Sequence, residues 1–139
     1  MTLGVVLDAG AFDVLATPAG ASLRSLLAQT AARGGLVTVA AVTLAEVARG
    51  AARTRWVQAA VARTSFGARI VVVPTDERLA YLAASILHTC GRGSEHIADA
   101  HVVAVAARFD VAVVATTDPD DIAALSVAVP GTRVLTRRP

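Results

Sequence analysis

The sequence predicts an α/β protein, with a three-layer α/β/α domain built around a central, mostly parallel sheet of four to five strands. Two observations lead to this prediction. Short runs of β-branched residues alternate along the chain with longer stretches rich in alanine and leucine, as strands alternate with helices. The short runs are also continuously apolar, which is typical of strands buried on both faces of a parallel sheet.

Each element of this fold can be placed along the chain. The strand segments lie at Leu3–Leu7, Leu36–Ala40, Ile70–Val73, Val111–Ala115 and, with a weaker pattern, 132–136. Helical segments fill the intervals, at residues 9–16, 20–33, 43–64, 76–90, 95–108 and 119–125. Crossovers between parallel strands are right-handed in nearly all proteins, so the helices are expected on both faces of the sheet.

Length and composition indicate a single domain. The chain has 139 residues, of which 55% are hydrophobic, enough for one real core and too few for two ordinary domains. We find no internal repeat or long linker, so residues 1–139 are expected to form one domain. The longest uncharged stretch, 79–91, is shorter than the ~18 residues of a spanning helix, and no signal peptide precedes the first strand. We therefore expect a cytoplasmic protein that does not use a membrane.

The basic residues exclude several kinds of chemistry. All 13 are arginine, and the net charge is only +2. Without lysine there can be no Schiff base or P-loop, and a receiver domain or haloacid-dehalogenase-like phosphatase would lack a residue that it needs. Gly10 also stands where such a phosphatase has a second acid. Arginine is a planar fork suited to phosphate, so the composition is compatible with nucleic acid.

Acidic residues follow two of the predicted strands. In open α/β sheets, ligands bind beyond the carboxyl ends of the strands, and Asp8 and Asp118 stand there. Either residue could instead cap the next helix, since aspartate is a favoured N-cap and Pro119 suits a first helical position. Asp120 and Asp121 would lie in the first turn, where the helix dipole favours negative charge.

Glu46 and Asp99 lie on predicted helices. Thr43 and Glu46 have the spacing of a capping box, so capping and metal binding compete for the Glu46 side chain. Asp99 lies within a helix that is apolar on nearly every side, where an ionised carboxylate costs several kcal/mol unless it is compensated. The compensation would be a salt bridge to a distant arginine or a bound metal ion.

Taken together, these acids predict a metal site. Four carboxylates at one end of a sheet repel each other strongly without a cation, and the absence of an accompanying cysteine favours Mg²⁺ or Mn²⁺ over zinc. His96 and Asp99 have a spacing that could serve zinc, but no third ligand is fixed. The three histidines, His88, His96 and His101, are therefore expected to be surface or packing residues, and the single Cys90 a small buried apolar residue.

The ordered set of acids resembles that of PIN-domain ribonucleases, especially the VapC-type toxins of bacterial toxin–antitoxin pairs. The resemblance covers nearly the whole chain and is carried by Val6-Leu7-Asp8-Ala9, Thr43-Leu44-Ala45-Glu46-Val47, Ile97-Ala98-Asp99-Ala100 and Thr116-Thr117-Asp118-Pro119-Asp120-Asp121-Ile122. One departure is Gly10, because the family often has serine or threonine two residues after its first aspartate, whose hydroxyl could support that carboxylate.

The resemblance implies a metal-dependent endoribonuclease. Asp8, Asp99 and Asp118 would hold one or two Mg²⁺ (or Mn²⁺) ions, with Asp121 as a further candidate and Glu46 as a ligand or a base that orients water. The substrate would be RNA, with tRNA and rRNA as candidates, and the expected partners are a cognate antitoxin and a second copy in a homodimer. A non-catalytic PIN-like interaction or RNA-binding module is the alternative.

Other residues have less specific expectations. Four arginines follow Glu46 and could grip the RNA backbone or simply form a solvated face: Arg49, Arg53, Arg55 and Arg63. Three aromatic residues, Trp56, Phe66 and Tyr81, are too scattered to stack bases and are expected as core or interface anchors.

Overall fold

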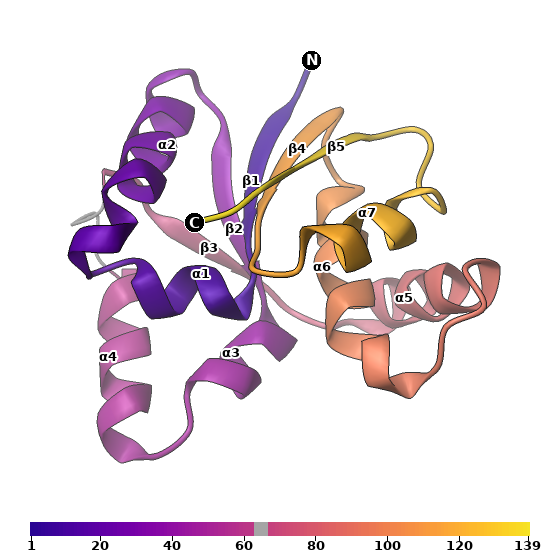
Figure 1. The fold of residues 1–139 in the computed structure, drawn as a ribbon, viewed down its shortest axis with the longest axis horizontal. Helices are drawn as coiled ribbons and strands as arrows, with labels where there is room; N and C mark the ends of the chain where they lie inside the picture. Colours follow the sequence, from indigo (N-terminus) through magenta and orange to yellow (C-terminus); the bar gives the residue numbers. More distant parts are fainter. Residues whose placement is uncertain (63–66) are drawn as a thin grey trace.

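The computed structural model describes residues 1–62 and 67–139, and it confirms the predicted α/β/α architecture (Figure 1). Its five-stranded sheet is parallel throughout, in the order β3-β2-β1-β4-β5. The strands are β1 Leu3–Leu7, β2 Leu36–Ala40, β3 Ile70–Val73, β4 Val111–Ala115 and β5 Arg133–Arg137. The fifth strand starts one residue later than predicted and forms an edge of the sheet. Arg63 and Phe66 lie outside the described residues.

Helices cover both faces of the sheet. They are α1 Ala9–Val14, α2 Ala21–Ala32, α3 Ala41–Val47, α4 Ala51–Ala62, α5 Glu77–Thr89, α6 Ile97–Ala106 and α7 Pro119–Ser126, with short 3-10 turns η1 Pro18–Gly20 and η2 Ser94–His96. Figure 1 shows α1, α2 and α4 on one side, α5, α6 and α7 on the other, and α3 beyond the end of β2. None of the helices in the described ranges is long and apolar enough to cross a membrane.

The prediction of one helix over 43–64 is wrong. The chain enters α3 at Ala41, directly after β2, and leaves it after Val47. Gly50 then adopts a φ of +88°, a conformation that glycine tolerates and that a helix cannot contain, and α4 starts at the next residue. The early start also moves Glu46 away from the first turn of α3, to its last turn.

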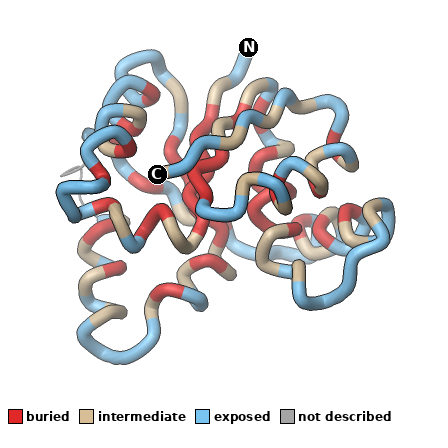
Figure 2. The backbone as a smooth tube through the Cα atoms, viewed as in Figure 1, coloured by how far each residue is buried: buried red, intermediate tan, exposed pale blue. Residues whose placement is uncertain are grey.

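Two apolar layers hold the sheet in place. Val6 and Val114 face the layer under α5, α6 and α7, while Val5 and Leu7 face the layer under α1, α2 and α4. Figure 2 shows that buried residues concentrate in the strands and in α6, where every residue from Ala100 to Ala106 is buried. The strands that carry the acidic residues at their carboxyl ends are therefore fixed by well-packed apolar layers on both faces.

Candidate metal centre

Strand register brings the first and last acidic segments together. β1 and β4 are parallel neighbours with Leu7 opposite Ala115, so the residues that follow them leave the sheet side by side. The backbone N–H of Asp8 donates to the carbonyl of Ala115 over 3.0 Å. The Asp8 side chain is buried and lies beside the loop that carries Thr116 and Asp118. Residues more than a hundred positions apart thus meet at one edge of the sheet.

Both carboxylate oxygens of Asp8 are held by hydrogen bonds. One accepts from the backbone N–H of Ala9 over 2.8 Å, so Asp8 is the N-cap of α1, the alternative that its position in the sequence left open. The other accepts from the hydroxyl of Thr116 over 2.7 Å. A carboxylate with two donors keeps further lone pairs available, so capping does not prevent Asp8 from facing a cation.

Thr116 supplies the hydroxyl that Gly10 lacks. An added Cβ at Gly10 would lie only 2.5 Å from the Cγ2 atom of Thr117, so the start of α1 approaches the β4–α7 loop too closely for a side chain in this arrangement. The same close approach puts the Thr116 hydroxyl in reach of Asp8. The hydroxyl of Thr116, in the loop after the neighbouring strand β4, can therefore support Asp8 where Gly10 offers none.

The Thr116→Val variant tests this compensation. We expect a loss of about 1–3 kcal/mol in the free energy of unfolding, because a buried carboxylate oxygen loses its donor. Metal affinity should also fall, since Asp8 is no longer fixed. Urea unfolding in chelator and calorimetric titration with Mn²⁺ measure the two effects, with the exposed neighbour variant Thr117→Val as control. Two variants that behave alike would show that the hydroxyl does not support the site.

Asp99 lies in the first turn of α6, at the point where this buried helix reaches the surface. Burial raises its pKa, the charge of Asp8 raises it further, and Asp121 and Asp118 add smaller contributions, while the contact with His96 acts in the opposite direction. Within the described residues, the only salt bridge that includes Asp99 is with His96, at 3.7 Å. The alternative of an arginine partner is therefore not supported there.

Glu46 faces the same group of charges from α3. Glu46 is exposed as a residue, and partial burial of its carboxyl group raises its pKa, as do the charges of Asp8 and Asp99, while Arg49 acts in the opposite direction. The capping-box alternative is wrong, because the N-cap of α3 is Ala40 and Glu46 lies in the last turn. The hydroxyl of Thr43 is buried and has no hydrogen-bond partner among the residues that the structure describes.

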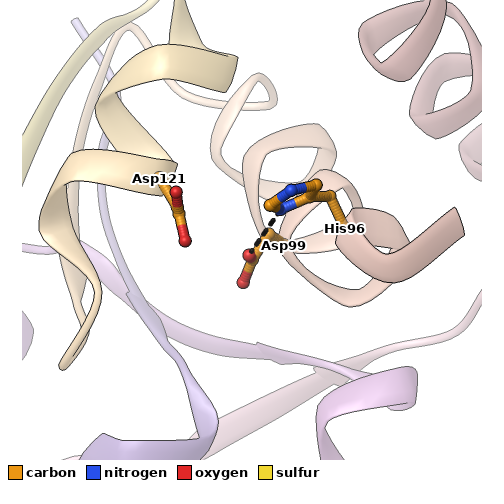
Figure 3. A group of neighbouring side chains, drawn as sticks. All are labelled: His96, Asp99 and Asp121. Atoms are coloured by element: carbon orange, nitrogen blue, oxygen red, sulfur yellow. Dashed lines mark ion pairs between the residues drawn. The ribbon is translucent and has the colours of Figure 1, made fainter. Parts of the chain in front are cut away.

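The acids of the last motif differ in their positions. Asp118 is at the N-cap of α7, but its side chain makes no capping hydrogen bond, and its backbone N–H donates to Thr116. Asp121 is half-buried and joins Asp99 and His96 in a group whose ligand atoms all lie within 4.8 Å of one another (Figure 3). Asp118 is exposed and is not part of this compact group.

The candidate site therefore contains five carboxylates that act on one another's charge: Asp8, Glu46, Asp99, Asp118 and Asp121. Their mutual repulsion raises the cost of ionising Asp99 and Glu46. Bringing up a divalent cation would remove that cost, and carboxylate oxygens are suitable donors for Mg²⁺ and Mn²⁺. The donor set fits such an ion.

Two residues near the site were not predicted as part of it. The sequence indicated His96 only as part of an incomplete zinc site, although its spacing of three residues from Asp99 is the signal that places the two side chains together. Arg138 donates from its Nη1 to the carbonyl of Thr117 over 3.1 Å and lines a hollow with Asp118, Asp120 and Asp121. No sequence pattern pointed to Arg138, because its position follows from the pairing of β5 with β4.

One of the arginines proposed to grip RNA has another role. Arg53 forms a salt bridge with Asp13 at 2.7 Å and donates to the carbonyl of Val47. Its guanidinium also lies 4.4 Å from the ring centroid of Trp56. These contacts tie α4 to α1 and α3, so Arg53 is explained by packing.

Comparison with known proteins agrees with this fold. The PIN domain family model matches residues 5–127, so the chain belongs to the PIN domain family. The structure is similar to that of VapBC2 from Rickettsia felis bound to a promoter DNA fragment, with a TM-score of 0.63 and 12% identity over 96% of this chain and 98% of that one. It is also similar to DNA-bound VapBC from Salmonella typhimurium, with a TM-score of 0.60 and 17% identity over 97% and 98%. A comparison with curated protein sequences gave no significant match.

Proposed function

We propose that this chain is a metal-dependent endoribonuclease that hydrolyses RNA phosphodiester bonds, and that it is the toxin of a type II toxin–antitoxin pair. The observation that carries the proposal is the convergence of five carboxylates on the rim of a PIN-domain sheet. A structural role alone does not explain why Asp99 and Asp121 crowd together in a half-buried place.

We assign a role to each residue from its position in the site. Asp8, Asp99, Asp118 and Asp121 are the ligand candidates, and hydrogen bonds already orient Asp8. A bound Mg²⁺ or Mn²⁺ would lower the pKa of a water molecule and offset charge on the phosphoryl oxygens. Glu46 stands at the exposed side of the group with a raised pKa, which suits a carboxylate that orients the attacking water and accepts its proton.

The structural relatives support one of the expected partners, the antitoxin. Both structural relatives are VapBC assemblies, and this supports a cognate antitoxin that covers the acidic rim. We also propose that residues 1–139 act as one domain, that two copies form a homodimer, and that the substrate is a cytoplasmic tRNA or rRNA.

The position of Arg138 beside the acids suits a contact with the RNA backbone next to the cleaved bond.

A cleavage assay tests the proposed activity. Purified chain is incubated with tRNA and rRNA fragments in Mg²⁺, in Mn²⁺ and in chelator, beside Asp8→Asn and the control Glu77→Gln, whose carboxylate lies on the exposed start of α5. We expect metal-dependent cleavage that Asp8→Asn loses and Glu77→Gln keeps. Equal cleavage by all three proteins would reveal a contaminating nuclease. RNA binding without cleavage under any of these conditions would favour the non-catalytic PIN-like module.

Replacing Arg138 should weaken RNA binding. Arg138→Gln in an Asp8→Asn background is expected to reduce the dependence of log affinity on log salt by about 0.7, the value for one phosphate contact with a single strand. Arg133→Gln is the matched control, because Arg133 is an exposed arginine at the opposite end of β5. Fluorescence anisotropy with labelled RNA at several salt concentrations gives both slopes. Identical slopes would show that Arg138 is only part of a solvated surface.

A further inference from the structure

We propose that His96 is a direct ligand of the catalytic metal ion and makes the site select Mn²⁺ over Mg²⁺. The inference rests on the metal site of the proposed function and adds a nitrogen ligand to its carboxylates. It comes from the group of His96, Asp99 and Asp121, which η2, α6 and α7 bring together (Figure 3).

The three side chains lie close to the spacing of a shared coordination shell. The Nδ1 atom of His96 lies 3.7 Å from the Oδ2 atom of Asp99, and all three ligand atoms lie within 4.8 Å of one another. Two ligands on opposite sides of an ion, each about 2.1 Å from it, are about 4.2 Å apart. Only small side-chain rotations are therefore needed to close the group around one ion.

The imidazole of His96 is available for this role. Its two contacts with carboxylates, 3.7 Å to Asp99 and 3.9 Å to Glu95, are both longer than a hydrogen bond. His101 differs, because its Nδ1 atom lies 2.7 Å from the carbonyl of Ile97 and its side chain is buried. His88 is exposed near the end of α5. His96 alone of the three histidines joins a possible ligand group in the described residues.

Local structure explains why His96 points into the site. η2 ends at His96, which is also the N-cap of α6, so its side chain stands over the first helical turn. Asp99, three residues later, lies on the same side of that turn. In the alternative role, His96 would only offset the charge of the Asp99 carboxylate, and its imidazole would not need to lie near Asp121 as well.

A nitrogen ligand changes the metal preference. Mg²⁺ demands oxygen ligands in near-ideal octahedral geometry, whereas first-row transition ions accept imidazole. The two aspartates keep the site hard enough for Mn²⁺, which also suits carboxylates. A site that adds one imidazole to its carboxylates is thus expected to bind Mn²⁺ more tightly than Mg²⁺, whereas carboxylates alone would discriminate less between the two ions.

Electron paramagnetic resonance of bound Mn²⁺ tests the ligand directly. The full chain, its His96→Gln variant and the control His88→Gln are loaded with Mn²⁺, and nitrogen coupling is measured by electron spin echo envelope modulation. We expect coupling to nitrogen in the wild type and in His88→Gln, and its loss in His96→Gln. Titration with Mg²⁺ as competitor should show that His96→Gln lowers Mn²⁺ affinity about tenfold or more and leaves Mg²⁺ affinity nearly unchanged.

The outcomes separate the two proposals. Bound Mn²⁺ without nitrogen coupling, or with coupling that persists in His96→Gln, would overturn the role of His96 and leave the carboxylate site and the nuclease function standing. Failure of the wild type to bind either ion would overturn the metal site itself, and the proposed function with it. Circular dichroism of each variant identifies a loss of binding that follows from unfolding, and His96→Asn then provides a second substitution at the same place.

Discussion

Asp99→Asn is expected to lower metal-dependent RNA cleavage by at least about a hundredfold, because changes to residues that merely support a ligand already cost 10–100-fold in affinity or activity. The metal-free variant should nevertheless be at least as stable as the wild type. Burial and the charge of Asp8 make ionised Asp99 unfavourable in the absence of a cation, and asparagine removes that charge while keeping the shape of the side chain. Function and stability are therefore expected to move in opposite directions.

Two measurements check this expectation. Cleavage rates in Mn²⁺ and Mg²⁺ give the loss of function, and urea unfolding in chelator at neutral pH gives the stability. Glu77→Gln is again the control, since it also removes one negative charge but lies outside the acidic group. A variant that loses stability in chelator along with its activity would show that Asp99 holds the fold together, and would contradict its assignment to the metal site.

Metal ions should stabilise the folded protein strongly, and more so as pH rises. A free ion concentration of 100 times its dissociation constant adds about 2.7 kcal/mol to the free energy of unfolding. Asp99 and Glu46 have raised pKa values in the folded protein, so the stability that they contribute without metal is present below their ordinary values of 3.8 and 4.5. It is lost as pH rises through the raised values. A cation removes this loss, because it favours the ionised carboxylates.

Thermal unfolding at a series of pH values, with Mn²⁺ or with chelator, measures the effect. The contribution of Asp110 to stability has the opposite pH dependence. Its hydrogen bonds with Thr2 lower its pKa, so its contribution is lost as pH falls. The difference between wild type and Asp99→Asn isolates the site from such groups. We expect the stabilisation by Mn²⁺ to increase with pH in the wild type. In the variant, we expect a smaller stabilisation. A benefit that is the same in both proteins would place the ion elsewhere.

Much of the fold could be predicted because its signals are local. The β-branched runs marked each strand to within a residue, since burial on both faces requires continuous apolar sequence. The prediction of one helix over 43–64 was wrong because Gly50 adopts a positive φ and ends the helix. This signal is local, but it is ambiguous in the sequence, since a single glycine can also remain within a helix. The order of the strands was not predicted, because it depends on contacts between distant segments.

Members of the candidate site could be predicted where their position in the sequence implied a chemical role. Asp8 and Asp118 follow strands, and Asp99 was singled out by the cost of burial, which its raised pKa reflects. The position of Thr116 beside Asp8 depends on a contact between neighbouring strand ends, and that of Arg138 depends on the pairing of β5 with β4. No spacing in the sequence indicates either contact. For Glu46 the sequence did contain a spacing signal, the capping box with Thr43, but this signal was misleading. Because α3 starts at Ala41, Glu46 lies too far along the helix to cap it.

The hydrogen bond from Thr116 to Asp8 has an evolutionary consequence. A hydroxyl two residues after the first aspartate and a hydroxyl from the loop that follows the neighbouring strand β4 can both donate to the same carboxylate, and Gly10 is compatible with the second arrangement. Loss of one hydroxyl is then expected to be tolerated where the other is present. Alignments of PIN domains should therefore show glycine at the first position together with serine or threonine at the second, and a relative that lacks one hydroxyl should not be dismissed as inactive before the other position is read.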